Sequence, residues 1–222
     1  MALKINRTVT RITKIVGWGL IIIILACFTK VYIWEKKYYK QESVAPRSDS
    51  VAVITKLPVL KNIATSEITK EDHDNYQVEM AYPRYLKIER LSLDVIVRRE
   101  AVSNDGALQY PENLNEAAWY SGSSKPGYGG AIVMSGITSY KDSDGAFKGL
   151  DSLEQGDKLE IVTGDNKTFG YVVKSISQSS NKDAENVLPK AEQRIDGKET
   201  LSLIGVSDGE DSFVVIRATI ED

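Results

Sequence analysis

The feature that most constrains the fold is a series of short apolar runs after Tyr82, each separated from the next by turn residues. The runs read RYLKIERL, LDVIVRREAV, AIVMSGI, KLEIVTG, TFGYVVKSISQ, TLSLIGV and SFVVIRATI. Their Val, Ile and Tyr content and partial alternation are typical of β-strands, and the pieces between them are rich in Gly, Asp and Asn. Seven or eight such strands predict an all-β barrel or sandwich. Two other pieces, NLNEAAWY and SDGAFKGLDSL, are each predicted to contribute a short helix.

An apolar segment near the N-terminus, residues 15–34, predicts a single transmembrane helix. It is uncharged from Ile15 to Thr29, and Lys30 can snorkel so that about 20 residues span a bilayer core. Residues 1–40 carry eight basic and one acidic side chains, whereas the remainder carries 20 basic and 30 acidic ones. A basic arm on an acidic body indicates a membrane partner and argues against nucleic acid. Basic residues before the span favour a cytoplasmic N-terminus.

Two alternatives for this segment stay open. It can be a cleaved signal peptide, although a small-x-small cleavage site is missing. It can also be a lipoprotein signal, because ILAC places Cys27 after a small residue at the end of an apolar run. We therefore predict four parts: a cytoplasmic basic N-terminus over 1–14, an anchor over 15–34, an extracytoplasmic stalk or linker over 35–80, and a β-domain over 81–222. Within the linker, VAVITKLPVL can form a short strand or dock on the domain.

The cysteine and histidine counts exclude several chemistries. Cys27 is the only cysteine and His73 the only histidine, so an intramolecular disulfide and a Cys/His metal cluster are impossible. We expect no metal and no cofactor. His73 lies in the polar stretch TKEDHDNYQ and is interpreted as a solvated linker residue.

Four stretches in order resemble the sortases, the cysteine transpeptidases of the bacterial cell surface. They are RYLKIERLSLDVIV, NDGALQYPENLNEAAWYSGSSKPGYGGAIVMSGI, GAFKGLDSLEQGDKLEIVTGDNKTFGYVV and TLSLIGVSDG, within residues 81–222. The likeness is greatest to the class E/F-like enzymes of actinobacteria. It implies an eight-stranded β-barrel with one or two short helices, held outside a membrane by an N-terminal anchor.

The resemblance also shows where this chain departs from the family. Sortases end the strand that matches LSLIGV on a catalytic Cys, and Val206 stands there. Ile137 in MSGI occupies the place of the family His, and counting back from Ala218 puts Phe213 in the place of the family Arg. Arg217 shares a strand face with Phe213 but lies about 13 Å further along at ~3.3 Å per residue. It is not assigned the family role.

These replacements predict an inactive site, because Val, Ile and Phe offer no nucleophile, no transferable proton and no charge. Ser207 and Ser135 are hydroxyls near the expected cleft, but a Ser-based hydrolase would need a Lys base, and none is singled out. KDSDG, residues 141–145, resembles part of a calcium loop but lacks the later ligands. The candidate residues of a substrate groove are Ile137, Thr138, Val206, Ser207, Phe213 and Arg217.

Three functions remain open. The first is a membrane-anchored pseudo-sortase of the bacterial cell surface that binds a sorting-signal-like peptide or an envelope protein. The second is an active sortase transpeptidase that anchors surface proteins to the cell wall or to pili, with catalytic residues that are misassigned above or substituted by others. The third is a purely structural surface module. The expected location is the plasma membrane, crossed once, with the C-terminal domain on the outside.

Overall fold

The computed structural model of the chain describes residues 29–30, 54–57, 59–100, 106–209 and 211–221. The chain divides into two compact units, residues 1–48 and 49–222. The predicted transmembrane segment lies outside the described residues, apart from Thr29 and Lys30, which are helical. Within the described ranges, no helix is long and apolar enough to cross a bilayer. The predicted residues 1–14 and Cys27 also lie outside the described residues.

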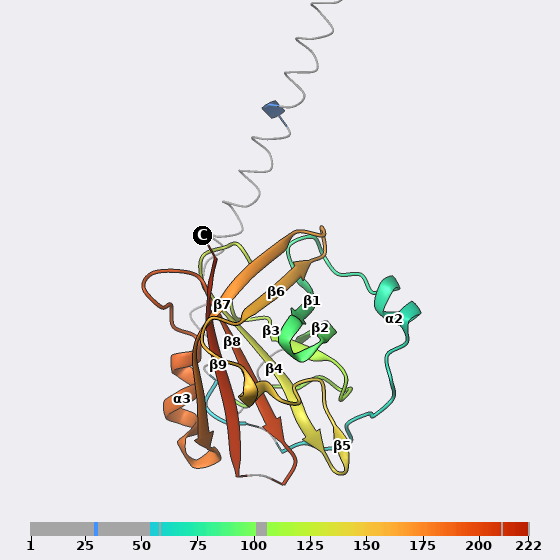
Figure 1. Cartoon of the computed structure of the whole chain (residues 1–222), viewed down its shortest axis with the longest axis vertical. Helices are drawn as coiled ribbons and strands as arrows, with labels where there is room; N and C mark the ends of the chain where they lie inside the picture. The colour runs from blue at the N-terminus through green and yellow to red at the C-terminus, as the bar shows by residue number, and fades with distance from the viewer. Residues whose placement is uncertain (1–28, 31–53, 58, 101–105, 210, 222) are drawn as a thin grey trace, which may run out of the picture. The chain divides into compact units, whose positions relative to one another are not determined.

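One sheet of nine strands forms the second unit (Figure 1). Its order is β3-β2-β1-β6-β7-β9-β8-β4-β5, and an additional pairing joins β3 to β4. Eight strands therefore close into a barrel, which confirms the predicted eight-stranded all-β barrel. The two-residue β5 is a ninth strand that pairs antiparallel with the end of β4. The strands are β1 Pro83–Ile88, β2 Leu93–Glu100, β3 Ala117–Tyr120, β4 Ala131–Tyr140, β5 Ser143–Asp144, β6 Lys158–Thr163, β7 Thr168–Ser180, β8 Thr200–Ser207 and β9 Ser212–Ile220.

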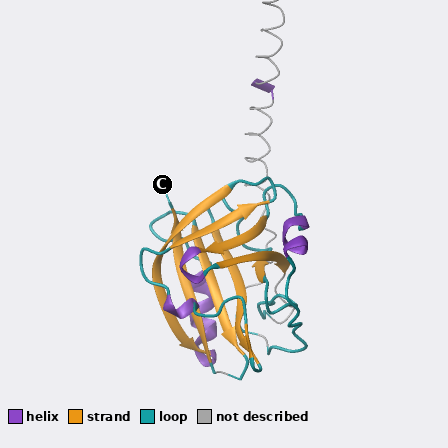
Figure 2. Ribbon diagram, turned by 45° about the vertical axis from the view of Figure 1, so that its right-hand side comes forward, coloured by secondary structure: helices purple, strands orange, loops and turns teal. Residues whose placement is uncertain are grey.

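Helices are few and short among the described residues of the second unit (Figure 2). They are α2 Lys70–Asn75, α3 Ala184–Ala191 and the 3₁₀ turns η1 Glu89–Leu91, η2 Leu150–Ser152 and η3 Asn181–Asp183. The predicted helix in NLNEAAWY is wrong, because Ala117–Tyr120 forms β3, which pairs in parallel with β2 and antiparallel with β4. Non-local pairing that closes the barrel outweighs local helix propensity there. The predicted helix in SDGAFKGLDSL is reduced to η2.

Alternate residues of β4, β8 and β9 face two different apolar layers, as the two-residue period of a strand requires. Met134, Leu203 and Ile216 belong to the core inside the barrel. Residues on the opposite face of the same strands belong to a second buried cluster, on the outside of the barrel. It contains Val133, Ile137, Ile204, Val206, Phe213 and Val215. The same cluster contains Ala184 and Leu188 of α3. The outer face of three barrel strands is thus a second core and not a bare surface.

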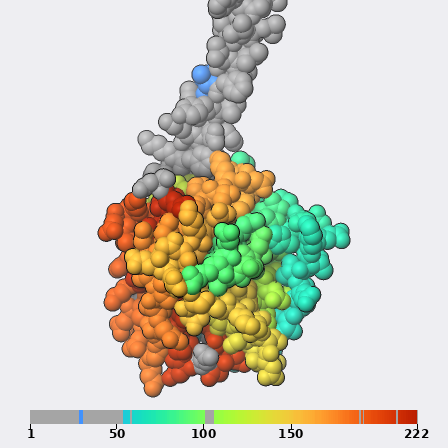
Figure 3. Space-filling view, in the orientation of Figure 1, coloured from blue at the N-terminus to red at the C-terminus, as the bar shows by residue number. Residues whose placement is uncertain are grey.

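Residues 54–80 lie within the predicted linker, and in the structure they contact the barrel. Ile54 is fully buried and Leu60 nearly so, both in the outer cluster. Further along, the Tyr76 hydroxyl donates to the Val97 carbonyl at 2.8 Å. Figure 3 shows atoms of this cyan part of the chain lying against the green and yellow barrel atoms. Apolar side chains spaced along a polar stretch are enough to dock it. Residues 35–53 lie outside the described residues.

Candidate functional site

Three strands bring Ile137, Val206 and Phe213, the residues that the sequence resemblance assigns to the family positions, together in one row. Ile137 of β4 is the register partner of Val206 of β8 in a parallel pairing. Val206 is in turn the register partner of Phe213 of β9 in an antiparallel pairing. The row therefore crosses β4, β8 and β9, which lie side by side at the lower end of the barrel in Figure 1. Residues far apart in the sequence become immediate neighbours on one sheet.

The row is buried. Ile137 is 0% exposed, Val206 6% and Phe213 1%. The outer cluster that contains them also includes Ile54 and Leu60 and the residues Leu108, Tyr110 and Leu114 of the loop before β3. An apolar row is stable in such a covered position, whereas an unpaired imidazole or guanidinium would be costly there.

A β-bulge lies directly beside the row. The pairing of β4 with β8 shifts register between Ile137 and Ser139, so Thr138 is the extra residue. The Thr138 hydroxyl donates to the Val206 carbonyl at 3.0 Å, and its oxygen lies 2.5 Å from the Ser207 hydroxyl oxygen. Bulges often re-aim side chains next to functional sites. Here the bulge holds two candidate groove residues, Thr138 and Ser207, against each other.

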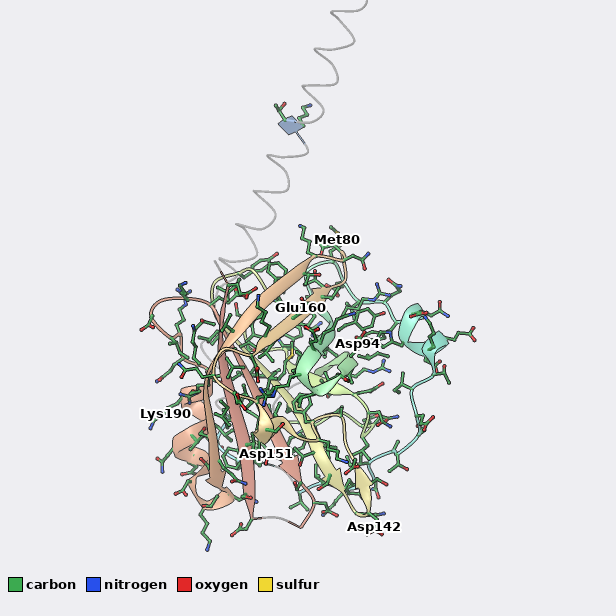
Figure 4. All side chains as sticks on the ribbon, in the orientation of Figure 1. Met80, Asp94, Asp142, Asp151, Glu160 and Lys190 are labelled. Atoms are coloured by element: carbon green, nitrogen blue, oxygen red, sulfur yellow. The ribbon has the colours of Figure 1, made fainter. Side chains whose placement is uncertain are left out.

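A polar pocket lies next to the row, and Phe213 belongs to both. It has a volume of about 300 Å³, within the range of small-ligand pockets. Thr138, Ser207 and Phe213 line it together with Gln178 and Ser212. Asp151, which Figure 4 labels, is also one of its lining residues. The pocket holds hydroxyls, amides and carboxylates, and its Lys148 is ion-paired with Asp144.

Arg217 lies apart from the row. It is the register partner of Ser202 on β8 and Ser175 on β7, further along β9 than Phe213 on the same outer face. Its Nε atom is buried and has no hydrogen-bond partner among the described residues. Burial lowers the pKa of this guanidinium. The structure therefore does not bring Arg217 to Ile137 and Val206.

Among the described residues, Ser135 and His73 each contact other groups and not one another. Ser135 is buried and donates to the Gln109 carbonyl at 2.9 Å. His73, interpreted from the sequence as a solvated linker residue, is partly exposed and also contacts the barrel: its Nε2 lies 3.2 Å from Asp94 Oδ1. Its ring also stacks on Tyr85 with centroids 4.3 Å apart. Across the described ranges, no group of three or more His, Cys, Asp or Glu side chains could hold a metal ion.

Sequence reasoning did not find the loop residues that pack against the row. The loop residues Leu108, Tyr110 and Leu114 enter the outer cluster. The Tyr110 hydroxyl is buried without a hydrogen-bond partner in the described part of the chain, and burial raises the pKa of this phenol. The run VAVITKLPVL was the available signal for Ile54 and Leu60, but it does not say which face the segment contacts.

Known proteins share this fold. The family model "Sortase domain" matches residues 86–218, more than half of the chain, and the chain therefore belongs to the sortase family. No protein of curated function matches it.

Solved structures show the same barrel. The pilus-related sortase C of Group B Streptococcus is 16% identical, with a TM-score of 0.55 over 85% of this chain and 90% of that one. A mutant of sortase C-1 from Streptococcus pneumoniae is 14% identical, with a TM-score of 0.53 over 84% and 88%. Sortase A from Corynebacterium diphtheriae is 16% identical, with a TM-score of 0.50 over 84% and 82%. At these identities the likeness concerns the fold.

Proposed function

We propose that this chain is a non-catalytic member of the sortase family that acts by binding. One observation carries the proposal: Val206, Ile137 and Phe213, the residues that the resemblance assigns to the places of the family's Cys, His and Arg, form a single buried row. Because three strands hold these positions side by side, all three replacements fall at one site. There, reactive side chains are replaced by apolar side chains that pack together.

The chemistry of transpeptidation needs a nucleophile, a proton donor for the leaving amine and a group that stabilises the oxyanion. None of the three side chains supplies any of these. The nearest hydroxyls, those of Thr138 and Ser207, contact each other, and the only histidine contacts Asp94. A nucleophilic hydroxyl with no adjacent base is a weak nucleophile at neutral pH.

The proposed location is the outer face of a bacterial membrane, with residues 15–34 as the anchor, 35–80 as the linker and 81–222 as the extracytoplasmic domain. The apolar run and the basic residues around it support the anchor. The proposed partner is a sorting-signal-like peptide or a protein of the cell envelope. Family membership supports a peptide or surface-protein partner, since sortases act on surface proteins that carry sorting signals.

The test is a cleavage and binding assay on the full chain in detergent micelles. An LPxTG-like peptide is incubated with the protein, with and without an amine acceptor, and the products are identified by mass spectrometry. We expect no cleavage, but saturable binding of the peptide relative to a scrambled peptide of the same composition. Cleavage that disappears in a Ser207→Ala variant would show an active enzyme. Absence of both cleavage and binding would leave a structural module.

A further inference from the structure

We infer that the second half of β7 is a strand-addition site, at which an extended basic segment of another protein joins the sheet. The added strand carries an apolar side chain beside Ile176 and a Lys or Arg side chain beside Gln178, two residues further along. This site is separate from the buried row, so the inference goes beyond the proposed function. Residues 175–180 are called the open edge below.

β6 is much shorter than β7 and covers only its first half. Register pairing between the two strands ends at Val172. The next residue, Val173, is still bonded on that side: its amide donates to the Asp157 carbonyl at 2.9 Å, and its carbonyl accepts from the Gly156 amide at 3.0 Å. From residue 175 onwards, β9 is the one strand that pairs with β7 among the described residues. The seam between β6 and β7 is therefore open along residues 175–180.

The open edge presents main-chain donors and acceptors to solvent. Alternate residues of a strand point their amides and carbonyls to opposite sides. The Asn181 amide donates to the Asp211 carbonyl at 3.0 Å, just beyond the paired ends of β7 and β9. By the two-residue alternation, residues 179 and 177 also face β9, whereas the amides and carbonyls of Ile176 and Gln178 face away from it. Across the described ranges, no hydrogen bond engages these four groups.

Little in the sequence protects this edge. Proteins usually blunt an exposed edge with charged residues, Pro or a bulge. Lys174 lies at a bulge where the open edge begins, but the residues that follow, SISQSS, contain no charge and no Pro. Ser177 and Gln178 are exposed, so solvent reaches the strand. An unblunted edge with unused main-chain groups is the kind of edge that accepts an added strand.

The polar pocket of about 300 Å³ lies at the same edge and provides selectivity. Gln178 lines it. The register partner of Gln178 on β9 is Val214, which belongs to the inner core, so both side chains are on the inner face of the barrel wall. Register partners in neighbouring strands carry their side chains on one face. A residue of an added strand that pairs with Gln178 therefore points towards the pocket. The residue that pairs with Ile176 meets an apolar side chain packed against the inner core.

The charges of the pocket favour a cationic side chain. Asp144, Lys148 and Asp151 line it. Lys148 is ion-paired with Asp144, whereas Asp151 has no ion pair among the described residues, so one negative charge is left over. A Lys or Arg side chain of the added strand complements that charge. Residues 41–222 carry 20 basic and 30 acidic side chains, so the whole domain also attracts a basic segment at longer range.

The first test measures binding of a designed probe. A fluorescein-labelled peptide, Thr-Ser-Val-Thr-Lys-Thr-Ser, is titrated into the full chain in detergent micelles, and anisotropy is recorded. We expect saturable binding that weakens at least about ten-fold when Glu replaces the lysine of the peptide. Asp151→Asn should weaken binding of the lysine peptide at least about three-fold. Asp196→Asn is the matched control, because this exposed carboxylate precedes the start of β8 and does not line the pocket. Absence of saturable binding, or equal affinities for the two peptides, would overturn the inference.

A second test needs no change to the protein. In an added strand, alternate peptide nitrogens donate to β7 and the others point away. The Val, Thr and Lys nitrogens at the centre of the probe are therefore methylated one at a time. Strand addition predicts alternating effects, with a loss of affinity of at least about ten-fold at one parity and little change at the other. Equal losses at all three nitrogens would contradict strand addition.

Hydrogen exchange locates the bound peptide. With saturating probe, the amides of Ile176 and Gln178 should exchange at least about ten-fold more slowly, whereas the Ser177 amide, which faces β9, should change little. Unchanged exchange at Ile176 and Gln178 would place the peptide elsewhere and overturn the inference. A dimer of the chain without peptide that protects the same two amides would assign the edge to a second copy, which also overturns it. An LPxTG-like peptide should not displace the probe, because the row is a separate site, and displacement would refute that separation.

Discussion

Replacing Ile137 by histidine tests whether the row is a covered core or an open groove. Ile137 is completely buried, so the substitution removes about 2 kcal/mol of apolar burial. It also leaves an imidazole N–H without a partner in an apolar cluster, which costs a further 1–3 kcal/mol or so. We expect Ile137→His to lower the free energy of unfolding by roughly 3–5 kcal/mol at pH 8. Ile137→Val, which removes one methylene, should cost only about 0.5–1.5 kcal/mol.

The pH dependence of this variant has a definite sign. Burial in an apolar layer disfavours the charged form, so the pKa of the introduced imidazole lies lower in the folded protein than its unfolded value of about 6.5. Below that pH the unfolded chain binds more protons than the folded one. The stability of the variant, relative to the unsubstituted protein, should therefore fall further as the pH drops below about 6.5.

Denaturant unfolding of the full chain in detergent micelles, followed by near-UV circular dichroism at pH 8 and pH 5.5, measures both effects. The valine variant controls for the loss of packing alone. A loss below about 1 kcal/mol for histidine, or a stability that rises on acidification, would refute the reasoning. Either result would mean that the side chain at this position reaches water or an acidic partner, as in an open groove.

Three further predictions concern positions around the barrel. Glu199 accepts hydrogen bonds from the Gly129 amide at 2.6 Å and the Tyr171 hydroxyl at 2.7 Å; Glu199→Gln should cost about 1–3 kcal/mol in denaturant unfolding, and a loss below about 0.5 kcal/mol would contradict this role. Burial raises the pKa of the Glu192 carboxyl, so the stability linked to this group is lost as the pH rises through its folded pKa. Glu192→Gln should therefore be more stable than the unsubstituted protein at pH 7, with the difference vanishing towards about pH 4; an equal or lower stability at pH 7 would count against burial of the charge. A Cβ at Gly145 would lie 2.1 Å from the Ile137 carbonyl oxygen, so Gly145→Ala should lower the thermal midpoint by several degrees, whereas an unchanged midpoint would show that the loop can move away.

The barrel was largely predictable from the sequence, because its strands are short runs rich in Val, Ile, Leu and Tyr between clear turn signals. The prediction failed at Ala117–Tyr120, which forms β3 instead of a helix. The reason is physical: β3 exists because it pairs with β2 on one side and β4 on the other. A short alanine-rich stretch carries no local signal of those partners.

The row of the candidate site was predictable only as separate positions. Resemblance to a family pointed to Ile137, Val206 and Phe213 one at a time, and the pairing of three strands makes them neighbours. That Ile54 and Leu60 join the same buried cluster could not be predicted from the sequence pattern. Ile54 is separated from β4 along the chain by α2, β1, β2 and β3, and where it docks depends on the outer cluster, which forms only in the folded chain.

The parallel pairing of β4 with β8 has a consequence for how the chain folds. Ile137 and Val206 are neighbours in space, yet β5, β6, β7 and α3 lie between them along the chain. Contacts of such high sequence separation carry a large loop-closure entropy, and they slow the folding of β-rich domains. During synthesis, Ile54 and β4 leave the ribosome well before β8 and β9. The row is thus completed last, and until then the apolar side of β4 depends on other contacts to keep it from associating with other chains.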